Sequence, residues 1–206
     1  MSVSLGDLAL YAGALLVLFL TPGPVWLALI ARGLAGGFGA VWPLALGVVV
    51  GDVLWPALAL LGVGALASQS AAALGLMRWV AVAMFAVMGL RLWRRAGAPL
   101  EVPGRLTAPG TAAGFGAGVA VILGNPKAIL FYMGILPGFF DLTALGGTDI
   151  AAICALSAAV PLFGNLVLGL LLGRVRGLLA SPRARGRLER VAAALMLVVA
   201  AVIAAG

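Results

Sequence analysis

Leu123-Gly124-Asn125-Pro126-Lys127-Ala128 places a proline and a lysine inside a long apolar run. Phe19-Leu20-Thr21-Pro22-Gly23-Pro24 interrupts an earlier apolar run in the same way. Proline has no backbone N–H, so within a helix it removes a hydrogen bond and breaks or kinks the helix. We interpret the two interruptions as breaks in two membrane helices and as the two halves of one binding site.

The composition is that of an integral membrane protein. Of the 206 residues, 64% are hydrophobic and 9% are charged, and the mean hydropathy is +1.22. Soluble domains have about 25% charged residues. Six membrane spans need roughly 120 residues at about 20 residues each. The remainder suffices for short loops and leaves no room for a soluble domain.

The residues that most catalytic and metal chemistry requires are scarce. The chain has no histidine, which is the usual general base and a common metal ligand. The single cysteine, Cys154, excludes a disulfide within one chain, and we interpret it as a small core residue. We therefore expect no enzyme activity, no metal and no cofactor. The net charge of +7 does not indicate a nucleic-acid partner, because the arginines cluster beside apolar spans.

The apolar runs predict an all-α membrane protein with six transmembrane helices in one domain. Basic connectors, about 94–109 and 173–187, follow the third and fifth spans. Segment 1–7 has no basic residue, so we expect no signal peptide. The expected spans are about 8–31 (broken near Pro22), 40–66, 76–93, 111–136 (broken at Pro126), 150–172, and 187 to the C-terminus.

The arginines orient these spans. With six spans, one side of the membrane has few basic residues. It has Arg78 together with Asp7, Asp141 and Asp149. Because basic loops remain in the cytoplasm, the distribution predicts that both termini lie outside the cytoplasm, whereas five spans would misplace a basic connector. With six spans, eleven of the thirteen basic residues share one side: Arg32, Arg91, Arg94, Arg95, Arg105, Arg174, Arg176, Arg183, Arg185, Arg187 and Arg190.

The sequence also repeats itself, in halves of about 1–95 and 110–206. Thr21-Pro22-Gly23 aligns with Asn125-Pro126-Lys127, and Gly51-Asp52 aligns with Gly164-Asn165. Each half has an odd number of spans, so the second half enters the membrane upside down. Inverted repeats with helix breaks at matching positions are typical of secondary transporters.

The breaks release backbone groups that suit a ligand. Pro22 leaves the carbonyl of Leu18 without its helical donor, and Pro126 does the same to Ile122. We expect a substrate ammonium to bind such carbonyls. The N–H groups of the half-helices that restart after each break suit a carboxylate. The alternative is that both breaks are packing kinks without a ligand.

Lys127 is the strongest single indication of a site. A lysine near the bilayer centre costs roughly 2.5–3.5 kcal/mol on insertion scales. The alternative is that its side chain reaches a membrane interface. It lies about nine residues, or about 14 Å, from the end of its span, and a lysine side chain covers about half that distance. We therefore expect Lys127 to face the interior.

Asp52, near the middle of the second span, has two compatible interpretations. It forms a structural ion pair with Lys127, or it is a functional carboxylate that binds a substrate amine or takes up the coupling proton. Its repeat partner Asn165 is neutral, so the two halves differ chemically. The G-x-x-x-G segments 47–51 and 169–173 predict close helix packing. The expected substrate-binding residues are Thr21, Pro22, Gly23, Pro24, Asp52, Asn125, Pro126, Lys127 and Asn165, with Asp52 also the proton-coupling candidate.

These residues resemble the motifs of the lysine exporter (LysE/RhtB) superfamily of amino-acid efflux proteins. The resemblance covers essentially the whole chain. It implies an antiporter that exports amino acids or related metabolites through the bacterial inner membrane, driven by a proton or other ion gradient. It does not identify the substrate. The matching motifs are Thr21-Pro22-Gly23-Pro24, segment 47–52, and Gly124-Asn125-Pro126-Lys127-Ala128 followed by Phe131-Tyr132 and Leu136-Pro137-Gly138-Phe139.

Two further classes remain as alternatives. A transporter of the same shape for a metal or other inorganic ion would need several carboxylate, histidine or thiol ligands, and Asp52 is the one carboxylate expected at depth. A non-transporting membrane scaffold would suit the glycine-rich spans but leaves the buried lysine and aspartate without a role. We expect membrane lipid, a small amino-acid-like substrate and a coupling ion as partners. A homo-oligomer is compatible with the sequence.

Overall fold

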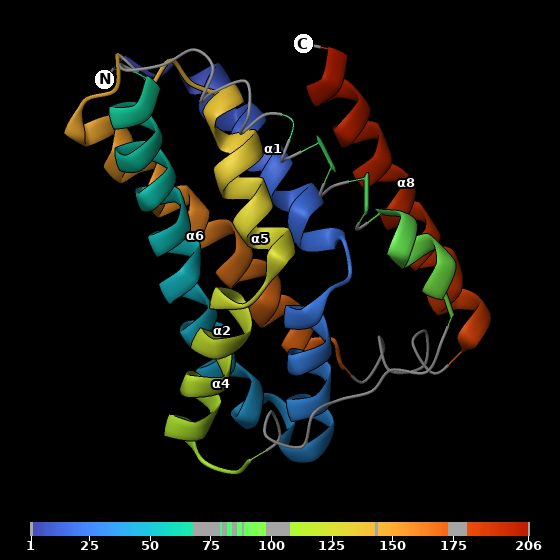
Figure 1. Ribbon diagram of the computed structural model, residues 1–206. Helices are drawn as coiled ribbons and strands as arrows, with labels where there is room; N and C mark the ends of the chain where they lie inside the picture. Colours follow the sequence, from blue (N-terminus) through green and yellow to red (C-terminus); the bar gives the residue numbers. More distant parts are fainter. Residues whose placement is uncertain are drawn as a thin grey trace.

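The computed structural model describes residues 2–67, 79, 82–83, 86–87, 89–97, 108–142, 144–172 and 181–205. All elements within these ranges are helices, which confirms the expected all-α class (Figure 1). Most of the expected third span, Arg78, Arg105, Arg174, Arg176 and Gly173 lie outside the described residues. The elements are α1 (Leu5–Leu20), α2 (Pro24–Ala67), α4 (Thr111–Leu123), α5 (Pro126–Leu130), the π-helical η2 (Phe131–Ile135), the 3-10 turn η3 (Leu136–Gly138), α6 (Gly147–Leu170) and α8 (Pro182–Ala205).

Several of these helices have the length and composition of membrane spans. Within the described ranges, Pro24–Gly62 and Gly147–Leu170 are each long and apolar enough to cross a bilayer. Thr111–Leu123 and Pro126–Gly134 form a third span if the pair, bent by 49°, is taken as one. α1 is a shorter apolar helix. The chain is therefore a membrane protein, and the full set of six spans stays a prediction.

The break between α1 and α2 falls where the prolines predict it. α1 begins at a capping box, in which the Asp7 N–H donates to the Ser4 hydroxyl at 3.1 Å and the Ser4 N–H donates to the Asp7 carboxylate at 3.2 Å. The last helical bond of α1 runs from the Thr21 N–H to the Val17 carbonyl. α2 then starts at Pro24, a first-turn position at which no N–H is needed.

α2 bends sharply at Gly36 and Gly37. Both residues have non-helical backbone, and Gly37 has a φ of 63°, a conformation that favours glycine. A straight helix of 44 residues would be about 66 Å long, roughly twice the hydrocarbon thickness of a membrane. The bend divides α2 into two segments and matches the expected boundary between the first two spans (Figure 1).

Arg32 connects this bend to the beginning of α4. Its side chain is buried, with 2% exposed. The guanidinium donates hydrogen bonds to the carbonyls of Ala40 at 2.8 Å, Ala108 at 2.9 Å and Gly110 at 3.1 Å. The planar fork of arginine suits several carbonyls at once, so Arg32 joins two segments that are distant in the sequence.

Glycines bring the second segment of α2 against α4. A Cβ placed on Gly47 would lie 3.0 Å from Gly118 Cα and would overlap the Phe115 carbonyl. A Cβ on Gly118 would in turn lie 2.9 Å from Gly47 Cα, and one on Gly51 would lie 2.6 Å from the Ile122 side chain. The close packing expected from the first G-x-x-x-G segment is therefore confirmed.

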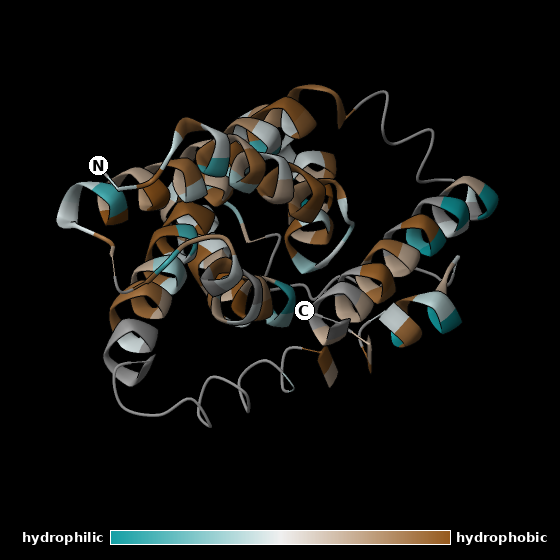
Figure 2. Ribbon diagram, turned by 90° about the horizontal axis from the view of Figure 1, so that it is seen from above, coloured by the Kyte–Doolittle hydropathy of each residue, from teal (hydrophilic) through white to brown (hydrophobic). Residues whose placement is uncertain are grey.

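Apolar residues both fill the interior and cover the outside of the bundle (Figure 2). Leu5 is 83% exposed and Phe163 71% exposed, as expected for side chains that face lipid. α8 lies beside the segment 89–97 at one edge of the bundle, where the Gly97 N–H donates to Glu189 at 2.6 Å. Both ends of the chain lie toward the same end of the molecule in Figure 1.

Candidate functional site

Lys127 lies at the start of α5, directly after the second break. α4 ends at Leu123, and the side chain of Asn125 caps α5 by accepting a hydrogen bond from the Lys127 N–H at 3.1 Å. The Lys127 side chain is buried, with 6% exposed, and its ammonium donates hydrogen bonds to the carbonyls of Leu18 at 2.8 Å and Thr21. The expectation that Lys127 faces the interior is confirmed.

These two hydrogen bonds join the two helix breaks. The Leu18 carbonyl is the one that loses its helical donor to Pro22. A Cβ on Gly23 would lie 3.5 Å from the Lys127 Nζ, so the lysine lies against the first break. The ammonium of Lys127 therefore supplies a donor to this carbonyl, and the binding of a substrate ammonium to such carbonyls stays a prediction.

Other carbonyls freed by the breaks are also satisfied by the protein. The Trp26 indole N–H donates to the Phe19 carbonyl at 2.8 Å. The Ile122 carbonyl, released by Pro126, accepts from the Asn125 N–H at 3.1 Å and from the Trp55 indole N–H at 3.4 Å. The breaks therefore persist in an apolar interior because side chains replace the missing helical donors.

Asp52 and Asn165 bring acceptor oxygens to the same region. Asp52 is 3% exposed, and its Oδ1 accepts a hydrogen bond from the Tyr132 hydroxyl at 3.1 Å. Within the described part of the chain, Asp52 Oδ2 and Asn165 Oδ1 are buried without a hydrogen-bond partner. The Lys127 ammonium donates to backbone carbonyls and makes no described hydrogen bond to Asp52, so the ion pair is not a direct contact here.

A half-open cavity connects these groups. It lies between α1, α2, α4, α5 and α6. The space within it that the centre of a water molecule can reach is about 40 Å³. That is room for a few waters. The apolar wall includes Trp26, Val48 and Pro161, and the polar lining consists of Asp52, Asn125, Lys127 and Asn165.

The other expected site residues shape the cavity without lining it. The Thr21 hydroxyl donates to the Val17 carbonyl at 2.8 Å, so Thr21 contributes its own backbone carbonyl and not its side chain. The break residues Pro22, Gly23 and Pro24 are half-buried, whereas Pro126 is exposed. Their role as substrate-binding residues stays a prediction, and in this structure the prolines act through the backbone that they interrupt.

Sequence reasoning did not name Tyr132 and Trp26 as site residues. Tyr132 follows Lys127 by five residues in an apolar stretch, and a buried tyrosine hydroxyl usually has a hydrogen-bond partner. The sequence therefore contained enough information to propose Tyr132 as a site residue. Trp26, two residues after Pro24, was less evident, because its role depends on the direction in which the indole points.

The comparisons with known proteins identify the family. The family model of the LysE type translocators matches residues 16–206. The chain belongs to the LysE type translocator family. This confirms the resemblance inferred from the broken-helix motifs. The cavity at the two breaks is therefore a candidate site for a translocated solute.

Two of the relatives of this LysE type translocator are described as membrane proteins. An uncharacterized membrane protein of Synechocystis is 29% identical over 185 residues, 90% of this chain and 89% of the relative. One from Vibrio cholerae is 31% identical over 166 residues, 77% and 78% of the two chains. The chemotactic transduction protein ChpE of Pseudomonas aeruginosa is 34% identical over 128 residues, 61% and 62% of the two chains. No solved structure matches the chain.

Proposed function

We propose that the protein is a secondary-active exporter of amino acids or amino-acid-like metabolites across the bacterial inner membrane, coupled to protons. The observation that supports this most is the shared cavity at the two helix breaks. Lys127, Asp52 and Asn165 come from three helices and line it together. A cationic group and acceptor oxygens in one apolar cavity are complementary to a zwitterion, which has a carboxylate and an ammonium.

Lys127 is the proposed partner of the substrate carboxylate. An ammonium has three N–H donors, and two of those on Lys127 are used by the carbonyls of Leu18 and Thr21. The third N–H remains for a substrate carboxylate. Because the two carbonyls fix the position of the ammonium, the site is organised before substrate arrives.

Asp52 and Asn165 are the proposed partners of the substrate ammonium. Their oxygens Oδ2 and Oδ1, buried and without partners among the described residues, each lack a donor. Leaving a buried acceptor unsatisfied costs about 1–3 kcal/mol, more for a charged group. A substrate N–H₃⁺ donating to both oxygens would recover that cost. When the site is empty, Asp52 would instead take up the coupling proton.

The small cavity implies a conformational cycle. About 40 Å³ holds a few waters, so an amino acid enters when the helices around the cavity move apart. We infer that the two halves, about 1–95 and 110–206, are inverted repeats related by a pseudo-two-fold axis in the membrane plane and that they rock against each other. The hydrogen bonds from Lys127 to the first break link the halves, so substrate binding at Lys127 can influence their relative position.

The proposal is tested by a counterflow screen. Purified protein is reconstituted into proteoliposomes loaded with each amino acid in turn, and uptake of the same labelled amino acid is measured. We expect exchange of at least one amino acid, and accelerated net flux of that substrate when a pH gradient is imposed. The control is Lys127→Met, which should not exchange. Folded protein that exchanges no amino acid, or that carries an inorganic cation instead, would contradict the proposal.

A further inference from the structure

A second group of buried polar side chains continues from Asp52 away from the cavity. Tyr132, Ser157 and Tyr11 are each 0% exposed. The Tyr132 hydroxyl donates to Asp52 at 3.1 Å, and Ser157 lies against the same hydroxyl. The Ser157 hydroxyl donates to the Ile153 carbonyl at 2.8 Å, so in the 2.6 Å hydrogen bond between the Tyr11 hydroxyl and Ser157 Oγ the tyrosine is the donor. Two hydrogen-bonded pairs, Tyr11–Ser157 and Tyr132–Asp52, thus lie in one buried group, and Ser157 is the hydroxyl next to Tyr132 that would link them when it rotates away from the Ile153 carbonyl.

This group extends toward one end of the bundle. Tyr11 precedes the break residue Thr21 by ten positions on α1, about 15 Å at 1.5 Å per residue. Ser157 precedes Asn165 by eight positions on α6, about 12 Å by the same measure. α1 and α6 pack together and begin at the same end, where Ser2 bonds the carboxylate of Asp149 (Figure 1). The arginine distribution predicts that this end faces the outside.

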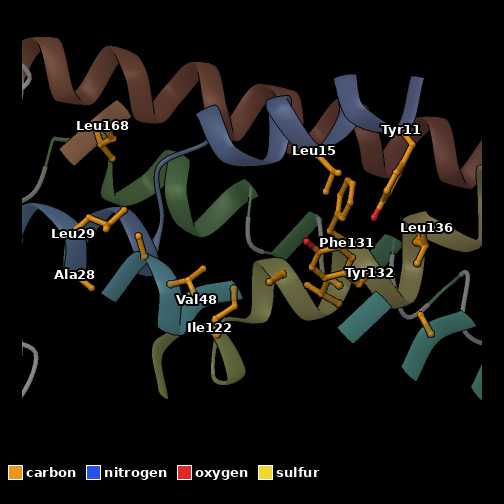
Figure 3. Packing of buried hydrophobic residues seen from close by; sticks show 14 of the residues in the cluster. Tyr11, Leu15, Ala28, Leu29, Val48, Ile122, Phe131, Tyr132, Leu136 and Leu168 are labelled. Carbon is orange, nitrogen blue, oxygen red and sulfur yellow. The ribbon is translucent and has the colours of Figure 1, made fainter. Parts of the chain in front are cut away.

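We propose that Tyr11, Ser157 and Tyr132 form a relay that carries the coupling proton between the outer half of the protein and Asp52. This inference rests on the proposed function, since it assigns a route to the proton in that cycle. In Figure 3 the Tyr11 and Tyr132 hydroxyls both lie in the interior between α1 and the segment that follows α5. Tyr11 and Ser157 are in direct hydrogen-bond contact, as are Tyr132 and Asp52, so no water is needed between the members of each pair.

The transfer conserves protons and charge. An incoming proton binds the Tyr11 oxygen as the Tyr11 proton passes to Ser157. The Ser157 hydroxyl turns from the Ile153 carbonyl and gives its proton to Tyr132, whose own proton passes to the Asp52 carboxylate. Only O–H bonds break and form, and each hydroxyl ends neutral. The net result is one outside proton bound on Asp52.

The outer end of the relay is closed by aromatic rings. The Tyr11 ring packs edge-on against Phe139 and Phe140, with ring centroids 5.6 and 5.4 Å apart, and stacks on Phe131 at 6.2 Å. Phe139 and Phe140 follow η3 at the end of the broken fourth span. The relay is therefore shut from the surface in this conformation, and movement of this segment would open it. A proton path that is closed at its outer end does not let protons pass continuously across the membrane.

The ionisable neighbours of the relay come from four helices. Lys127 on α5 and Tyr132 on η2 act electrostatically on Asp52. Cys154 on α6 and Asp52 on α2 act on Tyr11 of α1. A pH effect on coupling must therefore be assigned with variants that remove single hydroxyls and leave all these groups in place.

The test separates proton coupling from substrate exchange. The full-length protein is reconstituted as wild type, Tyr11→Phe, Ser157→Ala and Ser157→Thr, the last of which restores the hydroxyl. Two rates are measured with the amino acid that wild type exchanges best: counterflow at equal pH on both sides, and uptake driven by a pH gradient. We expect Tyr11→Phe and Ser157→Ala to retain counterflow and to lose gradient-driven uptake by about tenfold or more, as for loss of a positioned proton-transfer group. Ser157→Thr should recover it.

Each outcome decides the question. Wild-type gradient-driven uptake by both hydroxyl-deletion variants would overturn the relay, and so would an equal loss of counterflow and gradient-driven uptake, which indicates a structural role. If Ser157→Ala does not fold, Tyr11→Phe gives the same comparison. If wild type exchanges amino acids but ignores the pH gradient, proton coupling in the proposed function fails, and that result is distinguishable because it appears before any variant is compared.

Discussion

The ammonium nitrogen of Lys127 lies 2.8 Å from the carbonyl oxygen of Leu18, 109 positions earlier in the chain. Pro22 is the reason this carbonyl has no helical donor. The protein therefore uses a charged side chain from the second broken helix to satisfy the backbone of the first. A hydrogen bond with a charged donor contributes about 1.5–3 kcal/mol, roughly twice the neutral value. The break in the first helix and the burial of Lys127 therefore depend on each other.

Replacement of Lys127 by methionine should abolish substrate binding and weaken the fold. Met has a similar shape but no N–H, so the carbonyls of Leu18 and Thr21 would lose their donor. We expect a cost of about 1–3 kcal/mol per carbonyl left unsatisfied. Substrate binding is measured by counterflow, and stability by unfolding in detergent. Arg91→Met, which removes an exposed cation, is the control and should change neither quantity. Wild-type exchange by Lys127→Met would exclude its role in binding.

Replacement of Asp52 by asparagine should separate exchange from coupling. The Oδ1 atom of the introduced asparagine would still accept the hydrogen bond from Tyr132, so the local geometry should persist. Asparagine does not take up a proton, and its Nδ2 replaces the acceptor Oδ2, so the variant should still exchange substrate with weaker binding but lose transport driven by a pH gradient. The exposed carboxylate variant Asp141→Asn is the control. Full gradient-driven transport by correctly folded Asp52→Asn would rule out the proton role.

Two glycines on α4 test the packing against α2. Gly118→Ala places a Cβ 2.9 Å from Gly47 Cα and into the Leu44 carbonyl, and should destabilise the protein by about 1–3 kcal/mol through overpacking. Gly116→Ala has nothing within 4 Å and should be neutral or stabilising by about 0.5–1 kcal/mol. The free energy of unfolding in detergent compares the two. Equal stabilities would show that the close approach of the helices is not required.

The orientation of the chain can be tested with fused reporters. The eleven basic residues on one side of a six-span topology predict that both termini lie outside the cytoplasm. A reporter that functions only outside the cytoplasm, fused after Gly206, should be active. Fusion of the same reporter after Arg95 should be inactive, because that connector is expected in the cytoplasm. The reverse pattern would invert the topology and the direction assigned to the proton relay.

Features that depend on local covalent chemistry were readable from the amino-acid sequence. Proline lacks an N–H in any environment, so the chain itself indicated the breaks near Pro22 and Pro126 and the freed carbonyls of Leu18 and Ile122. Long apolar runs require helices in a membrane, because every backbone group must be paired there. The burial of Lys127 followed from the distance that its side chain would have to span.

The groups that meet across those breaks became known only from the packing of the helices. The sequence predicted that the Leu18 carbonyl needed a donor, but it did not show that Lys127 supplies it. Tyr132 was a motif residue without a known contact to Asp52, and Trp26 was not expected to donate to the carbonyl of Phe19. Such pairings depend on how α1, α2, α5 and α6 pack and on the rotation of each helix about its axis. Many residues jointly set that rotation, so no single stretch of sequence encodes it.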